Sequence, residues 1–339
     1  MESKEIVRRA IEFDRPPRLP FFLGDFWGEK ILGKRTDILY DVCDCWEMDR
    51  QKAGWFFDNP ALDDWGCRWE RTEVNNMGQV VGHPLADWSR LDKFLPPDPR
   101  DPFYFDRIGH VIDGANDKYV VVTSHFNLIE RLHMLHGFEE TMVDFRLAPE
   151  KIDRVLDLIL EFKIAQLDEL SRRFPGQVDG IFMTDDWGTQ SGAFVSPAIF
   201  SDFFLDRYRK LAAAIHGHGW HVILHSCGRV NDLVPFFIDA GVDVLNMQQP
   251  RAYGIAEIGN RFGGRVCFLT TVDIQTTLPE GDAHAVRQEA EELVARWSTP
   301  EGGFIVFNYG DAAAIGATDE ITEVMFDRFI ELAHYWRDR

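Results

Sequence analysis

The segment His225-Ser226-Cys227-Gly228 places an imidazole and a thiol two residues apart, directly after the apolar run 221–224. Side chains at this spacing on a loop can face one point, and Zn²⁺ accepts both nitrogen and sulfur ligands. A catalytic zinc site typically has three protein ligands and one open position, so a further ligand is needed. The candidates for it are Asp186, Glu130, Cys267 and Asp311. Without a metal, the same pair would be a hydrogen-bonded histidine beside a small buried cysteine.

Two adjacent carboxylates, Asp185 and Asp186, follow the apolar run 180–183 and precede Trp187-Gly188-Thr189-Gln190. Neighbouring side chains on extended backbone point in opposite directions, so one carboxylate can face a site while the other caps the next element. A carboxylate in a site can bind metal, hold an N–H group of a substrate, or act as acid or base. The alternative is an Asx turn with a helix cap. We take Asp185 and Asp186 as candidate catalytic residues, with Trp187 and Gln190 as candidate substrate contacts.

Polar residues also follow three other apolar runs. Gln248 and Gln249 follow the run 243–247, Asp273 follows the run 265–270, and Asn308 follows the run 303–307. Amide and carboxylate groups in such places can hydrogen-bond a polar ligand. We therefore predict that Gln249 and Asp273 orient the substrate, although these side chains could equally hold neighbouring loops together.

The elements that must position these residues alternate regularly from residue 119 onward. The β-branched and apolar runs predict six strands, at 119–123, 180–183, 221–224, 243–247, 265–270 and 303–307. Apolar residues at helical spacing predict helices at 137–145, 149–174, 196–217, 229–240, 283–297 and 319–336. A helix over 6–13 and a strand over 19–23 precede them. Strand and helix in alternation are typical of a parallel sheet with helices around it.

A TIM (β/α)8 barrel explains the pattern better than a doubly wound sheet. No Gly-x-Gly-x-x-Gly element follows the early strands, as a dinucleotide-binding sheet would need. The polar residues lie just after the strands, and in a barrel these positions surround the carboxyl-terminal mouth, where active sites lie. We predict one domain over 1–339, with loops and short helices over 24–100 as an irregular insertion at the barrel mouth.

Composition limits the classes of partner. The chain of 339 residues has 56 acidic against 36 basic residues and a net charge of −20, which disfavours a nucleic-acid partner. No apolar run is long enough to cross a bilayer. The five cysteines are an odd number, and the first residues are not an apolar leader, so we expect a cytoplasmic protein. Cys43-Asp44-Cys45 has no matching second pair, which disfavours a metal site there.

The ordered motifs resemble the uroporphyrinogen decarboxylase superfamily over nearly the whole chain. They are Ser3-Lys4-Glu5 with Arg15-Pro16-Pro17-Arg18-Leu19-Pro20, Gly137-Phe138-Glu139, Pro149-Glu150-Lys151-Ile152, Asp185-Asp186-Trp187-Gly188-Thr189-Gln190, His225-Ser226-Cys227-Gly228 and Gly302-Gly303-Phe304-Ile305. The resemblance implies a single barrel and one of two chemistries.

The decarboxylase branch of that superfamily opens with an arginine-rich signature that binds the carboxylates of its substrate. The corresponding stretch here resembles Leu19-Pro20-Phe21-Phe22-Leu23-Gly24-Asp25-Phe26, which has no arginine and contains Asp25. A porphyrinogen with many carboxylates would find little to pair with there. We therefore place Asp25 among the candidate substrate contacts and disfavour that activity.

The other branch comprises zinc-dependent methyltransferases that exchange methyl groups with a corrinoid protein. Their zinc site resembles His-x-Cys with a distant second cysteine, and His225 and Cys227 match the first two ligands. The distant cysteine would fall near Tyr309-Gly310-Asp311, where there is none, so Asp311 is the candidate third ligand. The resemblance thus implies zinc, a corrinoid carried by a partner protein, and a small methylated or methoxylated substrate or a thiol acceptor.

Two alternatives to methyl transfer stay open on the sequence. The first is a cofactor-free decarboxylase of a porphyrinogen-like or other carboxylic acid, in which Asp185 or Asp186 protonates the substrate. The second is a non-catalytic protein that binds a tetrapyrrole or corrinoid on the same barrel. The sequence does not determine the oligomeric state, for which a homodimer is one candidate.

Overall fold

The computed structural model describes residues 1–23, 30, 36–42, 61–70, 78–106, 108–310 and 312–334. Two predicted site residues, Asp25 and Asp311, lie outside the described residues, as do Cys43 and Cys45. No helix among the described residues combines the length and the apolar character needed to cross a membrane.

The predicted barrel is confirmed. Its eight parallel strands are β1 (Phe21–Phe22), β2 (Ile38–Val42), β6 (Tyr119–Ser124), β7 (Gly180–Thr184), β8 (His221–His225), β9 (Val244–Met247), β10 (Cys267–Thr270) and β11 (Phe304–Phe307). They hydrogen-bond in the order β1-β11-β10-β9-β8-β7-β6-β2. The two end strands meet because the Asp37 N–H donates to the Phe21 carbonyl oxygen at 3.0 Å. The Leu23 N–H likewise donates to Thr36 Oγ1 at 2.9 Å. These bonds close the curled sheet.

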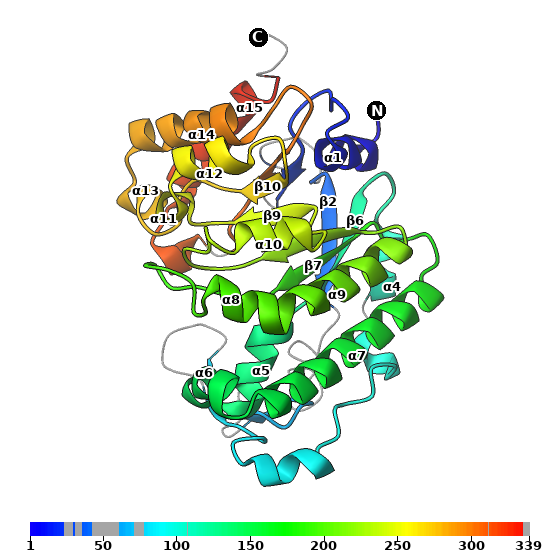
Figure 1. Ribbon diagram of the computed structural model, residues 1–339. Coiled ribbons are helices and arrows are strands. Elements are labelled where there is room, and N and C mark those ends of the chain that lie inside the picture. The colour runs from blue at the N-terminus through cyan, green and yellow to red at the C-terminus, as the bar shows by residue number, and fades with distance from the viewer. Residues whose placement is uncertain are drawn as a thin grey trace.

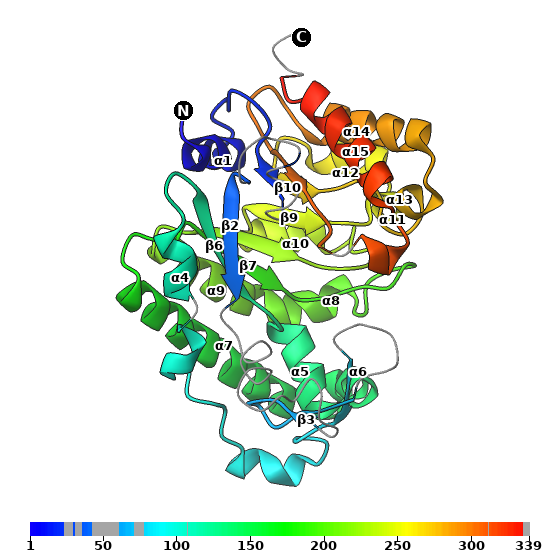
Figure 2. The same ribbon diagram turned by 180° about the vertical axis from the view of Figure 1, so that it is seen from behind.

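Helices surround the strands, as Figures 1 and 2 show, with α7 and α9 on one side and α12, α14 and α15 on the other. The helices are α1 (Ser3–Glu12), α4 (Ile108–Asp113), α5 (Leu128–His136), α6 (Phe138–Leu147), α7 (Pro149–Arg173), α8 (Pro197–Phe200), α9 (Asp206–Gly217), α10 (Val234–Asp239), α11 (Pro250–Tyr253), α12 (Ile255–Phe262), α13 (Thr277–Glu280), α14 (Ala283–Trp297) and α15 (Asp319–Glu331). The described residues also include the 3₁₀ helices η1 (Trp88–Lys93), η2 (Pro102–Tyr104) and η4 (Ala313–Ile315) and the π-helix η3 (Ser201–Leu205).

The barrel interior near the amino ends of the strands is a dry apolar core. Alternate strand residues such as Val244, Leu269 and Ile305 point inward, as the two-residue period of a strand requires. Val7 and Ile11 of α1 pack against them, so α1 closes this end of the barrel. Cys267, at the start of β10, is fully buried in the same core. This thiol therefore lies at the end of the barrel remote from the mouth and is not a ligand of a site there.

The region 24–100 departs from its prediction as loops and short helices. It contributes β2 to the barrel and also an antiparallel sheet of β3 (Ala61–Leu62), β4 (Arg68–Glu70) and β5 (Gln79–Gly82). A buried ion pair between Arg131 and Asp63, 2.9 Å between Nη1 and Oδ2, fastens this sheet to α5. The Arg131 guanidinium also lies over the Trp65 ring, 5.1 Å from its centroid. The insertion is thus anchored to the helix that borders the barrel mouth.

Most predicted elements after residue 119 are confirmed within a few residues, and α14 has the predicted bounds. The predicted helix 229–240 is wrong at its start, because residues 230–233 form a turn in which the Leu233 N–H donates to the Val230 carbonyl oxygen. Helix α10 therefore begins at Val234. Helices α4, α5, α11, α12 and α13 were not predicted.

Candidate metal centre and cavity

A cavity of about 760 Å³ opens at the carboxyl ends of the strands. It is lined by Phe22, Leu23, Thr123, His125, Phe126, Glu130, Phe182, Thr184, Asp186, His225, Cys227, Gln248, Gln249, Ile274, Gln275, Phe307, Asn308, Tyr309, Gly310 and Ile315. Most of its walls are aromatic, aliphatic or uncharged polar, and neither Lys nor Arg occurs among these described lining residues. Its size and lining are those of a pocket for a small molecule.

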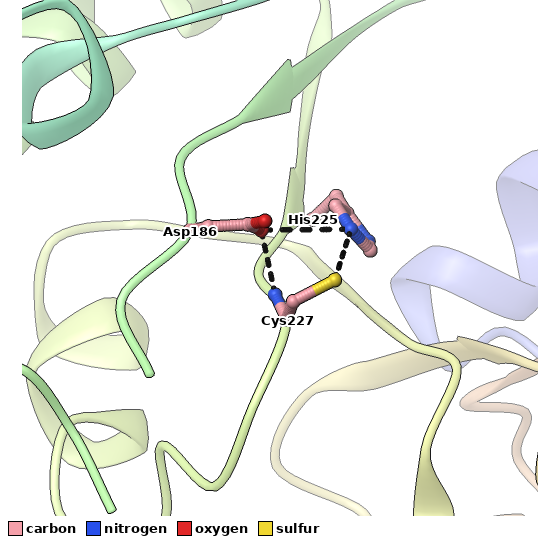
Figure 3. A group of neighbouring side chains, drawn as sticks. All are labelled: Asp186, His225 and Cys227. Carbon is pink, nitrogen blue, oxygen red and sulfur yellow. Dashed lines mark hydrogen bonds and ion pairs between the residues drawn. The ribbon is translucent and has the colours of Figure 1, made fainter. Parts of the chain in front are cut away.

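Asp186, His225 and Cys227 converge on one point of this cavity (Figure 3). One ligand atom from each lies within 4.8 Å of the others. His225 Nε2 is 3.3 Å from Cys227 Sγ and 3.7 Å from Asp186 Oδ1. An imidazole nitrogen, a thiol sulfur and a carboxylate oxygen form a donor set that suits zinc, and the cavity leaves room for a further ligand. The described residues contain no other group of this kind.

The loops after β7 and β8 hold these three side chains together. The Cys227 N–H donates to Asp186 Oδ1 at 2.7 Å, and the Arg229 N–H donates to the Thr189 carbonyl oxygen at 2.7 Å. Gly228 has φ +79°, and a Cβ there would lie 2.2 Å from the Gly188 carbonyl carbon. Only glycine fits this left-handed turn and close backbone approach. The His-x-Cys-Gly segment therefore needs its glycine to bring Cys227 beside Asp186.

The electrostatics of the site favour a cation. Burial, and then the carboxylates of Asp186 and Glu130, raise the pKa of the Cys227 thiol. Burial, and then Asp186 and Asp185, raise the pKa of Glu130 well above its usual value. In both cases the ionised form is disfavoured because negative charge accumulates in a space with little water. A divalent cation among these groups would reverse that effect and favour a thiolate.

The structure separates the two adjacent aspartates. Asp186 lines the cavity, whereas Asp185 is fully buried behind it and caps α5. The Asp185 carboxylate accepts hydrogen bonds from the N–H groups of Leu128, Ile129 and Glu130 and from the Tyr208 hydroxyl. Burial raises the pKa of Asp185 to about 7, although these hydrogen bonds oppose the shift. Because Asp185 does not reach the cavity, we do not retain it as a catalytic residue.

Three of the four predicted substrate contacts in the described chain do not line the cavity. Trp187 is fully buried, and its Nε1–H donates to the Tyr208 hydroxyl at 3.0 Å. The buried Asp273 carboxylate accepts from the Gln275 and Thr276 N–H groups, so it stabilises a turn. Gln249 lines the cavity, where its Oε1 accepts from Gln190 Nε2 at 3.1 Å. Gln190 is exposed and reaches the cavity wall only through this bond.

Replacement of Asp185 should mainly lower stability, whereas replacement of its neighbour Asp186 should mainly weaken zinc binding. Asp185→Ala leaves three backbone N–H groups and a buried hydroxyl without their acceptor, so it should lower the free energy of unfolding by about 2–4 kcal/mol. Asp186→Ala removes a partly exposed hydrogen-bond acceptor, so it should lower the free energy of unfolding by about 1 kcal/mol or less. It should, however, weaken zinc binding. Urea denaturation and zinc titration of both variants measure the two effects. Equal loss of stability in both would contradict this division of roles.

Several residues that line the cavity were not predicted from the sequence as site residues. Glu130 appeared only as one of four possible metal ligands, and His125 and Thr184 were not singled out. Glu130 lies in the first turn of α5, and its Oε2 accepts a hydrogen bond from Thr184 Oγ1 at 3.2 Å. No pattern around residue 130 predicts that Glu130 lies at the barrel mouth, because the start of α5 was itself not predicted. Only the position of Thr184, one residue before the Asp185-Asp186 pair, gave a signal.

Comparison with known proteins agrees with this architecture. The family model described as uroporphyrinogen decarboxylase (URO-D) matches residues 63–331. No curated protein matches the chain. A methyltransferase from Methanosarcina mazei superposes with a TM-score of 0.71 at 16% sequence identity, over 98% of this chain and 99% of that one. At this identity the likeness shows the shared fold.

Two mannanases are less similar. One from Podospora anserina has a TM-score of 0.46 at 12% identity, over 99% of this chain and 67% of that one. One from a Bacillus species has a TM-score of 0.43 at 10% identity, over 99% and 90%. Neither likeness is close enough to bear on the site.

Proposed function

The chain belongs to the uroporphyrinogen decarboxylase family, and on that premise we propose that it is a zinc-dependent methyltransferase. It exchanges a methyl group between a small methylated or methoxylated substrate, or a thiol acceptor, and a corrinoid protein. The observation that carries the proposal is the convergence of Asp186, His225 and Cys227 at one point of the cavity. The similar fold of the Methanosarcina mazei methyltransferase is consistent with it.

The three residues fit a zinc ion and would hold it as a carboxylate, a neutral imidazole and a thiolate. Together the two anionic ligands balance the charge of Zn²⁺, which suits a site with low solvent access. When bound there, the ion would act as a Lewis acid toward the heteroatom that carries or accepts the methyl group. Asp186 is the third ligand in this proposal, and Asp311, the third ligand predicted from the sequence resemblance, lies outside the described residues.

Methyl transfer in the demethylating direction needs a proton as well as a methyl acceptor. The bond between the methyl carbon and the substrate heteroatom breaks, and a bond between that carbon and the cobalt of cob(I)alamin forms. The heteroatom keeps the electron pair of the broken bond and takes up a proton. Glu130 is the described carboxyl group on the cavity wall whose raised pKa favours the protonated form, so we assign it as the proton donor.

The lack of Lys and Arg among the described lining residues supports methyl transfer over a porphyrinogen decarboxylase. A substrate with many carboxylates needs cationic partners, and the described lining residues supply none. The decarboxylase alternative used Asp185 or Asp186 as the proton source. Asp185 is buried behind the cavity wall, and Asp186 lies beside His225 and Cys227 as a candidate metal ligand. Uncharged amide groups of Gln248, Gln275 and Asn308 offer hydrogen bonds to a neutral substrate instead.

Metal content and methyl transfer test the proposal directly. The protein is purified without a histidine tag, its zinc is quantified by elemental analysis, and cobalamin spectra follow methyl exchange with methylated donors. We expect about one zinc per chain and conversion between cob(I)alamin and methylcobalamin that depends on zinc. Protein that takes up no zinc, even after zinc is added back, would rule the proposal out. Zinc without methyl exchange would support a corrinoid- or tetrapyrrole-binding role.

A further inference from the structure

Asn246 lies beside His225 in a single layer of the barrel. In the sheet register His225 of β8 is paired with Asn246 of β9, and Asn246 is paired with Leu269 of β10. Asn246 is fully buried and stands two residues after the inward-facing Val244, so its side chain also faces the interior. A buried amide in this layer is unusual among apolar neighbours, and its hydrogen bonds explain its presence.

Those hydrogen bonds fix which end of the Asn246 amide is the oxygen. Its Nδ2–H donates to the Leu269 carbonyl oxygen at 2.9 Å, and a carbonyl can only accept. Oδ1 therefore points the other way and lies 2.7 Å from His225 Nδ1. Since Oδ1 also can only accept, His225 must carry its proton on Nδ1. The lone pair of Nε2 is then available on the side of Cys227 and Asp186.

We propose that Asn246 is the positioning residue of the metal site, which holds His225 in the tautomer and ring orientation that a metal ion requires. This inference rests on the proposed function, because it concerns the same site. Histidine ligands generally donate their other N–H to a carbonyl or carboxylate, and removing that partner typically lowers metal affinity about 10–100-fold. Asn246 supplies the partner here from the next strand of the barrel.

The same oxygen also orients a cavity residue. Gln248 Nε2 donates to Asn246 Oδ1 at 2.8 Å, and the Gln248 side chain lines the cavity. This bond fixes the amide of Gln248, so its Oε1 is the acceptor left for a ligand. Asn246 thus connects the metal ligand His225 to a substrate-facing amide through one buried atom.

A neutral amide suits this place better than a carboxylate. Asp186 and a Cys227 thiolate already match the two charges of a divalent cation, and Glu130 stands nearby. A third permanent charge in the dry layer below the cavity would carry a large desolvation cost. Asn246 provides the acceptor that His225 needs without adding that charge.

The test compares two substitutions at this position in otherwise intact protein. Asn246→Leu keeps the approximate size but removes the acceptor, and Asn246→Asp keeps an acceptor for His225. Zinc dissociation constants come from competition with a chelator, and the absorption spectrum of the Co²⁺-loaded protein reports ligand geometry. We expect Asn246→Leu to weaken zinc binding about 10–100-fold and to change the Co²⁺ spectrum. Asn246→Asp should keep the zinc dissociation constant within roughly tenfold of that of the wild-type protein.

Thr270→Val is the matched control. It removes a buried hydrogen bond to the same strand β9, from Thr270 Oγ1 to the Met247 carbonyl oxygen, and has no hydrogen bond to His225. It should lower stability without changing zinc affinity. If Asn246→Leu does not fold, Asn246→Ser takes its place, because the shorter hydroxyl does not reach Nδ1.

The outcomes separate this inference from the proposed function. Wild-type affinity and an unchanged Co²⁺ spectrum in Asn246→Leu would overturn the positioning role while leaving the zinc site intact. Equal weakening in Thr270→Val would overturn it as well, since the effect would then be one of stability. Wild-type protein that binds no zinc would overturn both.

Discussion

His225→Ala and Cys227→Ala should each abolish stoichiometric zinc binding and, with it, methyl transfer. Each substitution removes one of the three proposed ligands among the described residues, and the two that remain would not hold zinc against dilution or a chelator. Loss of the Lewis acid should cost about 4 kcal/mol or more in the barrier, or roughly a thousandfold in rate. Elemental analysis and the cobalamin assay measure the two effects.

The chain should stay folded in both variants, because these side chains lie at the cavity rather than in the core. The side-chain hydrogen bonds of the Cys227 thiol go to His225 and Asp186, which belong to the same site. Cys267→Ala is the matched control, since it removes a thiol from the closed end of the barrel and should keep a full complement of zinc. A Cys227→Ala protein that retains one zinc per chain would show that the metal, if present, is bound elsewhere.

The sequence predicted the barrel because its strands are continuous apolar runs with turn residues between them. Strands β6 to β11 are buried on both faces and therefore show this signal clearly. Strand β2, Ile38–Val42, is interrupted by Asp41, and the weak periodicity around it concealed its place in the sheet. Its pairing with β6 places it in the sheet, and the hydrogen bond from the Asp37 N–H to the Phe21 carbonyl oxygen completes the ring.

Helix α5 escaped prediction for a physical reason that also concealed Glu130. Eight of its nine residues are buried, including Glu130, Arg131 and His136, so its polar side chains do not mark a solvent-exposed face. It is enclosed by the barrel mouth and by the insertion, to which Arg131 and Asp63 fasten it. A helix buried on all sides cannot be told from a strand by its hydrophobic pattern.

The aspartate pair shows what spacing alone cannot decide. Alternation on the extended backbone predicts that Asp185 and Asp186 face opposite ways, but not which of them faces the cavity. The answer depends on α5, whose first N–H groups need the acceptor that Asp185 provides. The start of an unpredicted helix thus determined the role of each carboxylate. Trp187, two residues after Asp185, points to the same side of the backbone, away from the cavity, and donates to the Tyr208 hydroxyl.

Glu130→Gln should lower the rate of demethylation about 10²–10⁴-fold while zinc binding is retained. Glutamine keeps the size and the hydrogen bond to Thr184 but cannot give up a proton. The protonated form of Glu130 is the active one in this direction, so the wild-type rate should fall as pH rises through the raised pKa of Glu130. That decline should disappear in Glu130→Gln. Bound zinc favours the carboxylate form of Glu130. The rate should therefore decline at a lower pH than the raised pKa of Glu130 in the metal-free protein indicates.

The pH dependence of the free energy of unfolding is a second test of the protonation of Glu130. The folded-state pKa of Glu130 is raised, so between the unfolded and folded pKa values the folded chain binds more protons than the unfolded chain. The free energy of unfolding of metal-free protein should therefore fall as pH rises through this window, and fall less in Glu130→Gln. Glu289→Gln is the control, because burial also raises the pKa of Glu289 while the carboxylate lies away from the cavity, against Thr277 and Asp273. It should flatten the stability profile without changing the rate. If both variants slow demethylation equally, Glu130 is not the proton donor.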